Sequence, residues 1–509
     1  MRLCTIAATV LLFLGCGGAP LVDRLAPYSD AADSCPESTS DKKGTDIESQ
    51  ILAAGIDDTT ATWAYVLEEG EEAVFSRAWL SAKSTKTLDI QYFIFSMDNV
   101  GIIALDHILE AANRGVHVRM LVDDFMLDVQ AEDVAALSAH PNISIRIYNP
   151  TEGKNTLQKV VHAARDFQGF NQRMHNKTFV VDGRVAITGG RNLADEYFDY
   201  DQDYNFRDRD VLLVGPGARS VRASFEMFWA HPLAVEMPGL MGNQMELAAA
   251  FRESVHAYSC DPENFWPEIR ARIEGIPSAI PSLVEAGRLH RLDSMRFVSD
   301  VPGKNNSGGY SGGGASTDAL LNLVSQAKTS LTIQSPYLVL TELGLGLFAD
   351  AVNRGVEVTI LTNSLCSTDN LEAFNGYQRI RKALLEAGVK VFEYRHDAEI
   401  RKRLITAEKQ KRRGYVPTFG LHAKSMVVDH QTVVIGTFNL DPRSANLNTE
   451  CVAIMSSAVM AEEVETLMKQ ELLPSNAWPT TLSSNPDHHA RWSKRVQTWL
   501  RGIVPASVL

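Results

Sequence analysis

The stretch that decides the fold is MHNKTFVVDG, residues 174–183, together with a second version, LHAKSMVVDH, at residues 421–430. Each version places a His, a Lys two residues later and an Asp five residues after the Lys, around a short apolar run. An apolar run bounded by polar residues predicts a buried strand that ends in a turn. Because side chains alternate along a strand, the His and the Lys point to one face. Two such strands facing each other would suit chemistry on a phosphate diester.

The repeated motif supplies six candidate site residues. The His can transfer a proton or act as nucleophile, and the Lys is a fixed cation. The Asp-Gly pair at residues 182–183 suits a tight turn, so we expect the two Asp residues to be structural rather than catalytic. The six residues are His175, Lys177 and Asp182 in the first copy and His422, Lys424 and Asp429 in the second.

A longer pattern is also repeated. A strand, a helix, an Asn-Arg-Gly turn and a second strand follow one another over residues 88–122 and again over residues 330–361. This order predicts a βαβ unit, with the Gly capping the helix. The two Asn-Arg-Gly turns are 240 residues apart (353 − 113), and the two His-Lys-Asp motifs are 247 apart (422 − 175). We therefore expect an α/β chain built by duplication as a pseudo-dimer.

The N-terminus is predicted to be a processing signal. A short apolar core at residues 5–14 precedes Gly15 and Cys16. This favours a lipoprotein signal over residues 1–16, in which Cys16 becomes the lipidated first residue and anchors the chain to a membrane face. An ordinary secretory signal is the alternative. Residues 17–57, rich in Gly, Pro, Ala, Ser and Asp, are predicted to be a flexible tether.

Three further segments are predicted after the tether. The first domain covers residues 58–235, a connector covers 236–315, and the second domain covers 316–509. The connector holds a glycine-rich loop at 303–314, which we interpret as a linker or mobile lid because it lacks the ending of a P-loop. The second domain ends in an amphipathic segment at 492–504, which either lies on a membrane surface or packs on the domain.

The composition of the chain argues against several classes of protein. The formal net charge of −13 and pI of about 5.5 argue against a protein that coats nucleic acid. No apolar run approaches the roughly 18–20 residues of a membrane-spanning helix. The six Cys residues are scattered, with neither a zinc pattern nor a dense disulfide framework, and any disulfide pairing stays open. We find no metal-binding motif and expect neither a metal nor another cofactor.

The longer strings around the motifs carry a family resemblance. GGRNLADEYF at residues 189–198 follows the first motif, and GTFNLDPRSANLNTE at residues 436–450 follows the second. With the two HxKxxxxD motifs, they resemble the phospholipase D superfamily and look most like bacterial cardiolipin synthases of the C type. The resemblance runs from about residue 58 to the C-terminus. It implies two phospholipase D-like domains, each a mixed sheet flanked by helices, packed as a pseudo-two-fold dimer with the active site at their interface.

Alignment of the two halves gives further site residues. Asn192 and Asn439 each lie 17 positions after the motif His and could donate amide hydrogens to phosphate oxygens. In the superfamily, an acid at the start of a later strand binds the ring nitrogen of the catalytic His that faces away from the phosphate. On this basis Asp210 is assigned to His175 and Glu450 to His422, with Asp208 as a competitor for the first role.

The resemblance also implies a two-step mechanism. One His attacks phosphorus to form a phosphohistidine, and the other protonates the leaving alcohol and then deprotonates the acceptor. By analogy His175 is the nucleophile and His422 the acid and base, although the sequence alone allows the reverse. The residues that line the pocket and select the acceptor are expected at strand ends, in residues 91–92 and 334–337.

The implied function is that of a cardiolipin synthase, which moves a phosphatidyl group from a phospholipid donor to phosphatidylglycerol. The expected partners are membrane phospholipids, namely phosphatidylglycerol and phosphatidylethanolamine, and a membrane surface, but no nucleic acid. One alternative is a phospholipase D that hydrolyses phospholipids to phosphatidic acid. A nuclease or phosphodiesterase and a non-catalytic lipid-binding scaffold are further alternatives. The expected location is a bacterial membrane, anchored through Cys16 and facing the periplasm or the outside, or else the inner membrane as a peripheral protein.

Overall fold

The computed structural model describes residue 25 and residues 46–127, 131–150, 172–237, 244–264, 279–304, 312–405 and 417–503. The predicted signal with Cys16, most of the tether, residues 305–311 of the glycine-rich loop and the end of the C-terminal segment lie outside these ranges. Within them, no helix has both the length and the apolar character needed to cross a bilayer.

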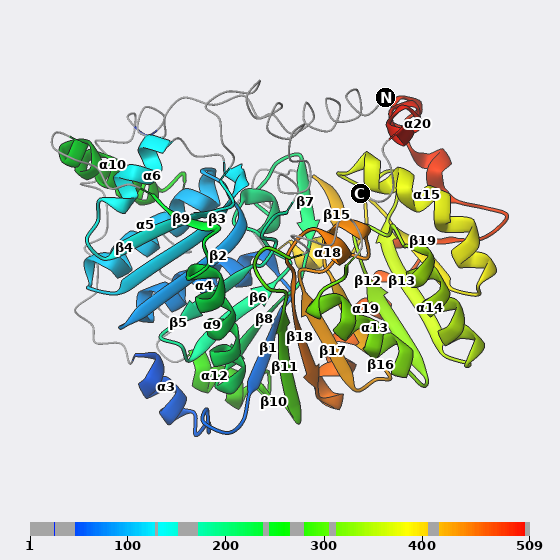
Figure 1. The fold of residues 1–509 in the computed structure, drawn as a ribbon, viewed down its shortest axis with the longest axis horizontal. Helices are drawn as coiled ribbons and strands as arrows, with labels where there is room; N and C mark the ends of the chain where they lie inside the picture. Colours follow the sequence, from blue (N-terminus) through cyan, green and yellow to red (C-terminus); the bar gives the residue numbers. More distant parts are fainter. Residues whose placement is uncertain are drawn as a thin grey trace.

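The first half is built on a nine-stranded mixed sheet with strand order β10-β1-β8-β6-β5-β2-β3-β4-β9 (Figure 1). β2 pairs with β3 in parallel and with β5 in antiparallel orientation. The strands are β1 (Trp63–Leu67), β2 (Thr87–Phe95), β3 (His117–Leu127), β4 (Ile143–Tyr148), β5 (Thr178–Val181), β6 (Val185–Gly189), β8 (Asp210–Val214), β9 (Ala234–Glu236) and β10 (His290–Arg291). The helices of this half are α3 (Ile47–Ala53), α4 (Gly70–Lys83), α5 (Asn99–Asn113), α6 (Ala131–Ser138), the short η3 (Asp195–Tyr197), α9 (Pro216–Trp229), α10 (Gln244–Cys260) and α12 (Ala279–Glu285).

The second half repeats this plan on an eight-stranded sheet with order β11-β18-β17-β16-β12-β13-β14-β19. Its β12 again pairs with β13 in parallel and with β16 in antiparallel orientation. The strands are β11 (Ser294–Ser299), β12 (Ser330–Gln334), β13 (Glu357–Asn363), β14 (Lys390–Tyr394), β16 (Ser425–Val428), β17 (Thr432–Gly436), β18 (Cys451–Ser456) and β19 (Ala477–Thr480). The helices are α13 (Ala315–Gln326), α14 (Glu342–Asn353), α15 (Leu371–Glu386), α16 (Arg401–Leu404), α18 (Pro442–Asn446), α19 (Ala458–Glu471), η4 (Pro486–His489), α20 (Trp492–Leu500) and η5 (Arg501–Ile503).

The two mixed sheets flanked by helices confirm the predicted fold class. Register shows the duplication at residue level, since Leu88 faces Val181 in one sheet and Leu331 faces Val428 in the other. A buried apolar cluster joins the halves and draws side chains from both sheets and from α9 and α19. Burial of such shared apolar surface holds the pseudo-dimer together.

Two segments depart from the predicted division of the chain. Residues 290–299, assigned to the connector, form β10 and β11 and extend the first and second sheets respectively. In addition, β7 (Tyr204–Arg207) and β15 (Thr418–Leu421) pair in parallel as a small sheet that crosses between the halves. The connector therefore contributes strands to both sheets, and the halves share backbone hydrogen bonds as well as apolar contacts.

A buried charge network fixes the halves beside this crossing. Arg207 Nε donates to Glu471 Oε1 at 2.5 Å, and Arg209 Nε donates to Glu68 Oε1 at 2.5 Å. Gln334 bridges them, accepting from Arg209 Nη1 at 2.6 Å and donating to Glu471 Oε2 at 2.5 Å. Since Glu68, Arg207 and Arg209 belong to the first half, the network ties it to the second half at a defined position.

Removing one charge of this network should destabilise the protein. Glu471→Ala removes one of the two carboxylates that pair with the buried Arg207 and leaves Glu68 as the other. The loss should therefore stay below about 3–5 kcal/mol, the cost of a fully broken buried pair. Urea titration should show that loss in the free energy of unfolding, whereas Glu462→Ala on the exposed face of the same helix should change it little. Equal effects of the two substitutions would contradict this role of Glu471.

Candidate active site

Each motif His is held by backbone from the opposite half. The His175 N–H donates to Thr449 O at 3.0 Å, and the His422 N–H donates to Arg207 O at 2.7 Å. Each Lys turns back onto its own motif, since Lys177 Nζ donates to His175 O at 2.8 Å and Lys424 Nζ to His422 O at 2.6 Å. The two copies thus present the same local arrangement on both sides of the interface.

The carboxylates that orient the imidazoles also come from the opposite half. Glu450 Oε2 lies 2.9 Å from His175 Nδ1, and Asp208 Oδ2 lies 2.5 Å from His422 Nδ1. Both carboxyl groups are fully buried, and the two His residues are 7% and 5% exposed. A carboxylate on Nδ1 keeps the proton there, so Nε2 of each ring is available for chemistry.

This geometry corrects the assignment of both acids. Asp210 does not contact His175, and Glu450 serves His175 rather than His422. The strand register gives the reason: Gly189 faces Asp210, but its counterpart Gly436 faces Val452. Hence the counterpart of Glu450 is Asp208, two residues before Asp210. Asp208 lies just before β8 and Asp210 is its first residue, so both are acids at the start of the same strand and the sequence pattern could not separate the two candidates.

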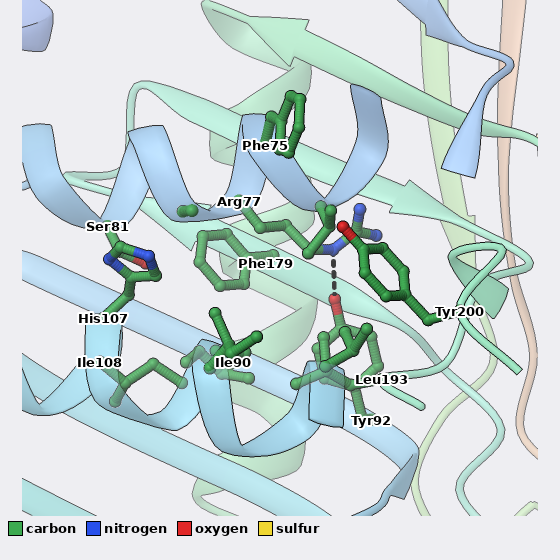
Figure 2. A pocket seen from close by; sticks show the side chains of 15 residues that line it. Phe75, Arg77, Ser81, Ile90, Tyr92, His107, Ile108, Phe179, Leu193 and Tyr200 are labelled. Atoms are coloured by element: carbon green, nitrogen blue, oxygen red, sulfur yellow. Dashed lines mark hydrogen bonds between the residues drawn. The ribbon is translucent and has the colours of Figure 1, made fainter. Parts of the chain in front are cut away.

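Asp210 instead anchors structural arginines. Its Oδ2 accepts from Arg77 Nη2 at 2.8 Å and lies 3.5 Å from Arg191 Nη1. Arg77 Nε in turn donates to the Tyr92 hydroxyl at 2.8 Å, and apolar side chains such as Phe179 surround this pair in a cavity between α4, α5 and the sheet (Figure 2). The cavity has none of the motif His or Lys residues in its lining.

Burial controls the charges at the site. Burial lowers the pKa of His175 to about 4, against the opposing pull of Glu450, and it lowers the pKa of His422 to about 3. Burial likewise lowers the pKa of Lys177 to about 8 and of Lys424 to about 7, partly offset by the nearby carboxylates. At neutral pH both imidazoles of the protein alone are therefore neutral, Lys177 is mostly protonated and Lys424 is partly protonated. An anion bound at the site stabilises further positive charge.

Aromatic rings wall the two imidazoles. Phe93 meets His175 edge-on at 5.1 Å between ring centroids, and Lys177 Nζ lies 5.6 Å from the centroid of the same ring. Tyr197 and Phe206 lie 5.1 and 4.8 Å from His422. These rings displace water from the site, which strengthens its electrostatic interactions.

The two Asn residues are buried beside the motifs. Asn192 Oδ1 accepts from the Ile94 N–H at 3.1 Å, and its side chain is also hydrogen-bonded to Tyr197. The Asn439 N–H donates to Ser444 Oγ at 3.2 Å, while Asn439 Oδ1 has no hydrogen-bond partner among the described residues. Contact of either amide with a phosphate stays a prediction.

The two motif Asp residues lie at the far ends of their strands from the His. Asp182 accepts backbone N–H groups at the start of β2, and Asp429 accepts the equivalent groups at the start of β12. Both have positive φ, 51° and 53°, as a tight turn requires. Their carboxylates join neighbouring strands at the edge opposite the site.

Most of the residues expected to line the acceptor pocket have structural roles instead. Gln91 bonds Met174 and Thr178, and Gln334 belongs to the buried charge network. Only Tyr337 reaches the site region, where its hydroxyl donates to Asp369 Oδ2 at 2.7 Å. Asp369 acts electrostatically on Lys424. No sequence motif points to Asp369, because it lies in the loop after β13.

One group of metal-ligating side chains exists among the described residues. Asp106, Glu110 and His256 bring ligand atoms within 4.8 Å of one another on α5 and α10. Asp106 Oδ1 and His256 Nδ1 lie 3.0 Å apart there, as in a hydrogen-bonded ion pair. None of the three residues belongs to the His and Lys site.

Comparison with known proteins identifies the family. A family model described as cardiolipin synthase, phospholipase D-like domain, matches residues 80–229 and 320–472, one match in each half. Cardiolipin synthase C of Escherichia coli strain K12 is 32% identical to this chain, over 86% of the chain and 87% of its own length. The chain belongs to this phospholipase D-like family.

Two further relatives agree with this membership. An uncharacterized protein of Helicobacter pylori strain J99 is 30% identical over 92% of the chain and 89% of its own length. The solved structure of phosphatidylserine synthase from Haemophilus influenzae Rd KW20 shares the fold, with a TM-score of 0.57, 14% identity and coverage of 90% of this chain and all of that one. The family resemblance drawn from the motifs is confirmed, and the chain is an enzyme of the phospholipase D superfamily.

The crossed pairing predicts different results for two neighbouring acids. Asp208→Asn should leave the fold intact. His422 would no longer keep its proton on Nδ1, which should reduce kcat on a phosphodiester by as much as about 10⁴-fold. Asp210→Asn should act through Arg77, lowering the melting temperature. Measured together, kcat and melting temperature separate the two roles. The reverse pattern would restore Asp210 as the orienting acid.

The lowered lysine pKa values predict proton uptake on anion binding. A phosphodiester anion stabilises the ammonium forms, raising the pKa of Lys424 above about 7 and of Lys177 above about 8. Binding should therefore take up protons and weaken as the pH rises between about 7 and 9. Calorimetry in two buffers of different ionisation enthalpy measures the uptake, and Lys424→Met should reduce it. Binding without linked protons would contradict these charge states.

Proposed function

We propose that the protein is a phosphatidyltransferase that makes cardiolipin, moving a phosphatidyl group from a phospholipid donor to phosphatidylglycerol. The observation that carries the proposal is the pair of His residues on one interface, each with its Nδ1 bound by a carboxylate and each beside a Lys. This arrangement supplies one nucleophile, one proton carrier and two cations to a single phosphate. Similarity to cardiolipin synthase C supports the choice of lipids.

In the first step His175 Nε2 attacks phosphorus. A P–N bond forms, the bond from phosphorus to the leaving alcohol oxygen breaks, and His422 Nε2 delivers a proton to that oxygen. The phosphate charge raises the pKa of the nearby His422 and so allows the imidazolium form. Lys177 and Lys424, together with amide hydrogens of Asn192 and Asn439, stabilise the negative charge that builds on the phosphoryl oxygens.

In the second step the neutral His422 takes a proton from the acceptor hydroxyl. The acceptor oxygen attacks phosphorus, the P–N bond breaks, and His175 is regenerated. Phosphatidylglycerol as acceptor gives cardiolipin, whereas water gives phosphatidic acid, which is the alternative phospholipase D activity. With phosphatidylglycerol or phosphatidylethanolamine as donor, the released alcohol is glycerol or ethanolamine.

We further propose that the enzyme is exported and anchored through Cys16 to a bacterial membrane, facing the periplasm or the outside. The apolar core at residues 5–14, followed by Gly15 and Cys16, supports this location. So does the disulfide-bonded state of Cys260, because disulfides persist in oxidising compartments. A peripheral inner-membrane location is the alternative.

Mass spectrometry of lipids tests the reaction. Purified protein added to vesicles of phosphatidylglycerol, with or without phosphatidylethanolamine, should produce cardiolipin together with glycerol or ethanolamine. Appearance of phosphatidic acid alone would reject the transferase and favour the hydrolase.

Two His variants serve as controls and assign the roles. His175→Ala and His422→Ala should each abolish product formation. With an activated phosphodiester whose leaving group needs no proton, such as a p-nitrophenyl ester, His422→Ala should still form and retain an adduct on His175, visible as added mass on the intact protein. An adduct that appears on His422 in the His175→Ala variant instead would exchange the two roles.

A further inference from the structure

The C-terminal helix α20 packs on the protein by its polar side. Lys494 Nζ donates to Thr368 O at 3.0 Å and Cys366 O at 3.3 Å, and Arg501 Nη1 donates to Glu372 Oε1 at 2.9 Å. Thr498, the most buried residue of the helix, accepts at its backbone carbonyl from Asn375 Nδ2 at 3.3 Å. Charged and polar groups therefore fasten α20 to the loop after β13 and to α15.

The opposite side of α20 presents its apolar residues to solvent. Trp492 and Trp499 are each 76% exposed, Leu500 is 56% exposed and Val496 is 44% exposed. Their positions follow the i, i+4, i+7, i+8 spacing of one helix face. A surface helix of a globular protein normally turns that face to the core, so the orientation here is inverted. A gathered apolar face of this kind marks an interaction site, unlike scattered single residues.

The charge of the segment indicates what covers this face. Residues 491–503 contain four basic residues and no acidic one, in a chain whose net charge is −13. Arg491 and Arg495 are exposed beside the Trp face. Trp and basic side chains together suit the boundary of a bilayer that contains anionic lipids, where the rings sit among headgroups and the cations meet phosphates.

The helix is also linked to the catalytic site. The loop that accepts Lys494 carries Ser367, whose carbonyl accepts the Tyr204 hydroxyl at 2.5 Å, and Asp369, which acts electrostatically on both Lys424 and Lys494. In Figure 1, α20 lies above α15 at the upper right of the molecule, and the β7–β15 pair lies nearer the middle of its upper half. A membrane bound by α20 would thus lie on the upper side of the molecule in this view, and the loop after β13 would connect it to the site.

We propose that α20 is a membrane-docking helix that inserts Trp492, Val496, Trp499 and Leu500 into the surface of an anionic phospholipid bilayer. This contact places the loop after β13, which connects α20 to the site, near the lipid surface from which the substrates come. The choice of a bilayer as partner rests on the proposed function, whereas the exposed face and its charge do not.

Vesicle binding tests the proposal. The full chain carrying Cys16→Ser, which removes the lipid anchor, is sedimented with vesicles of phosphatidylglycerol and phosphatidylcholine. Trp492→Ser/Trp499→Ser should weaken partitioning at least about tenfold, because both rings leave the interface. The matched control Leu52→Ser/Val459→Ser removes two other exposed apolar residues, 81% and 62% exposed, on α3 and α19. It should bind as the parent does.

Vesicles of phosphatidylcholine alone should bind the parent more weakly, because the basic residues lose their anionic partners. Equal binding by the Trp variant and the parent, or an equal loss in the matched control, would overturn the proposal. A dimer that the Trp substitutions dissociate, without any vesicle binding by the parent, would also overturn it, because a second copy would then cover the face.

Turnover separates this proposal from the proposed function. With short-chain phosphatidylglycerol below its micelle concentration, the Trp variant should keep the activity of the parent, since neither Trp contacts the motif residues. With vesicles it should lose activity in proportion to binding. Absence of turnover on both lipids in every protein would reject the enzyme function, while loss of vesicle binding by the Trp variant would still support the docking helix.

Discussion

The structure depends on two hydrogen bonds that cross between its halves, one donated by His175 to Glu450 and one donated by His422 to Asp208. Each bond joins a buried imidazole to a buried carboxylate, and neither half contains a complete pair. An unpaired carboxylate in such a position is costly, so the two halves are stable in this arrangement only together. The β7–β15 pair and the network around Arg207 hold the halves in the register that these bonds require.

This construction also sets the chemistry of the site. Burial alone favours the neutral forms of both His and both Lys residues, and the crossed carboxylates oppose it. The result is a site in which the pKa values of both His and both Lys residues are lowered and whose positive charge increases when a phosphate enters. A phosphodiester is then both the substrate and the counter-ion that completes the electrostatics, which favours binding of an anion over that of a neutral ester.

Several elements of the fold were predictable because they depend on local pattern. The apolar runs predicted the central strands, and the Asn-Arg-Gly turns predicted the ends of α5 and α14. Other elements were not. β10 has only two residues and β11 has six, and both lie in a stretch with weak periodicity, so that only pairing with β1 and β18 makes them strands. Asp369 was missed for a related reason, since a loop residue without a motif gains its role only from the side chains brought next to it.

The sequence by itself determined the duplication, the two His and Lys pairs and the structural place of Asp182 and Asp429, because strand periodicity and turn chemistry act over a few residues. Only the tertiary structure decided which acid serves which His. Asp208 and Asp210 both lie at the start of β8, so their difference arises from sheet register and from the crossing of the two halves. The orientation of α20 was decided in the same way: its spacing showed an apolar face, but only its contacts with the loop after β13 and with α15 turn that face to solvent.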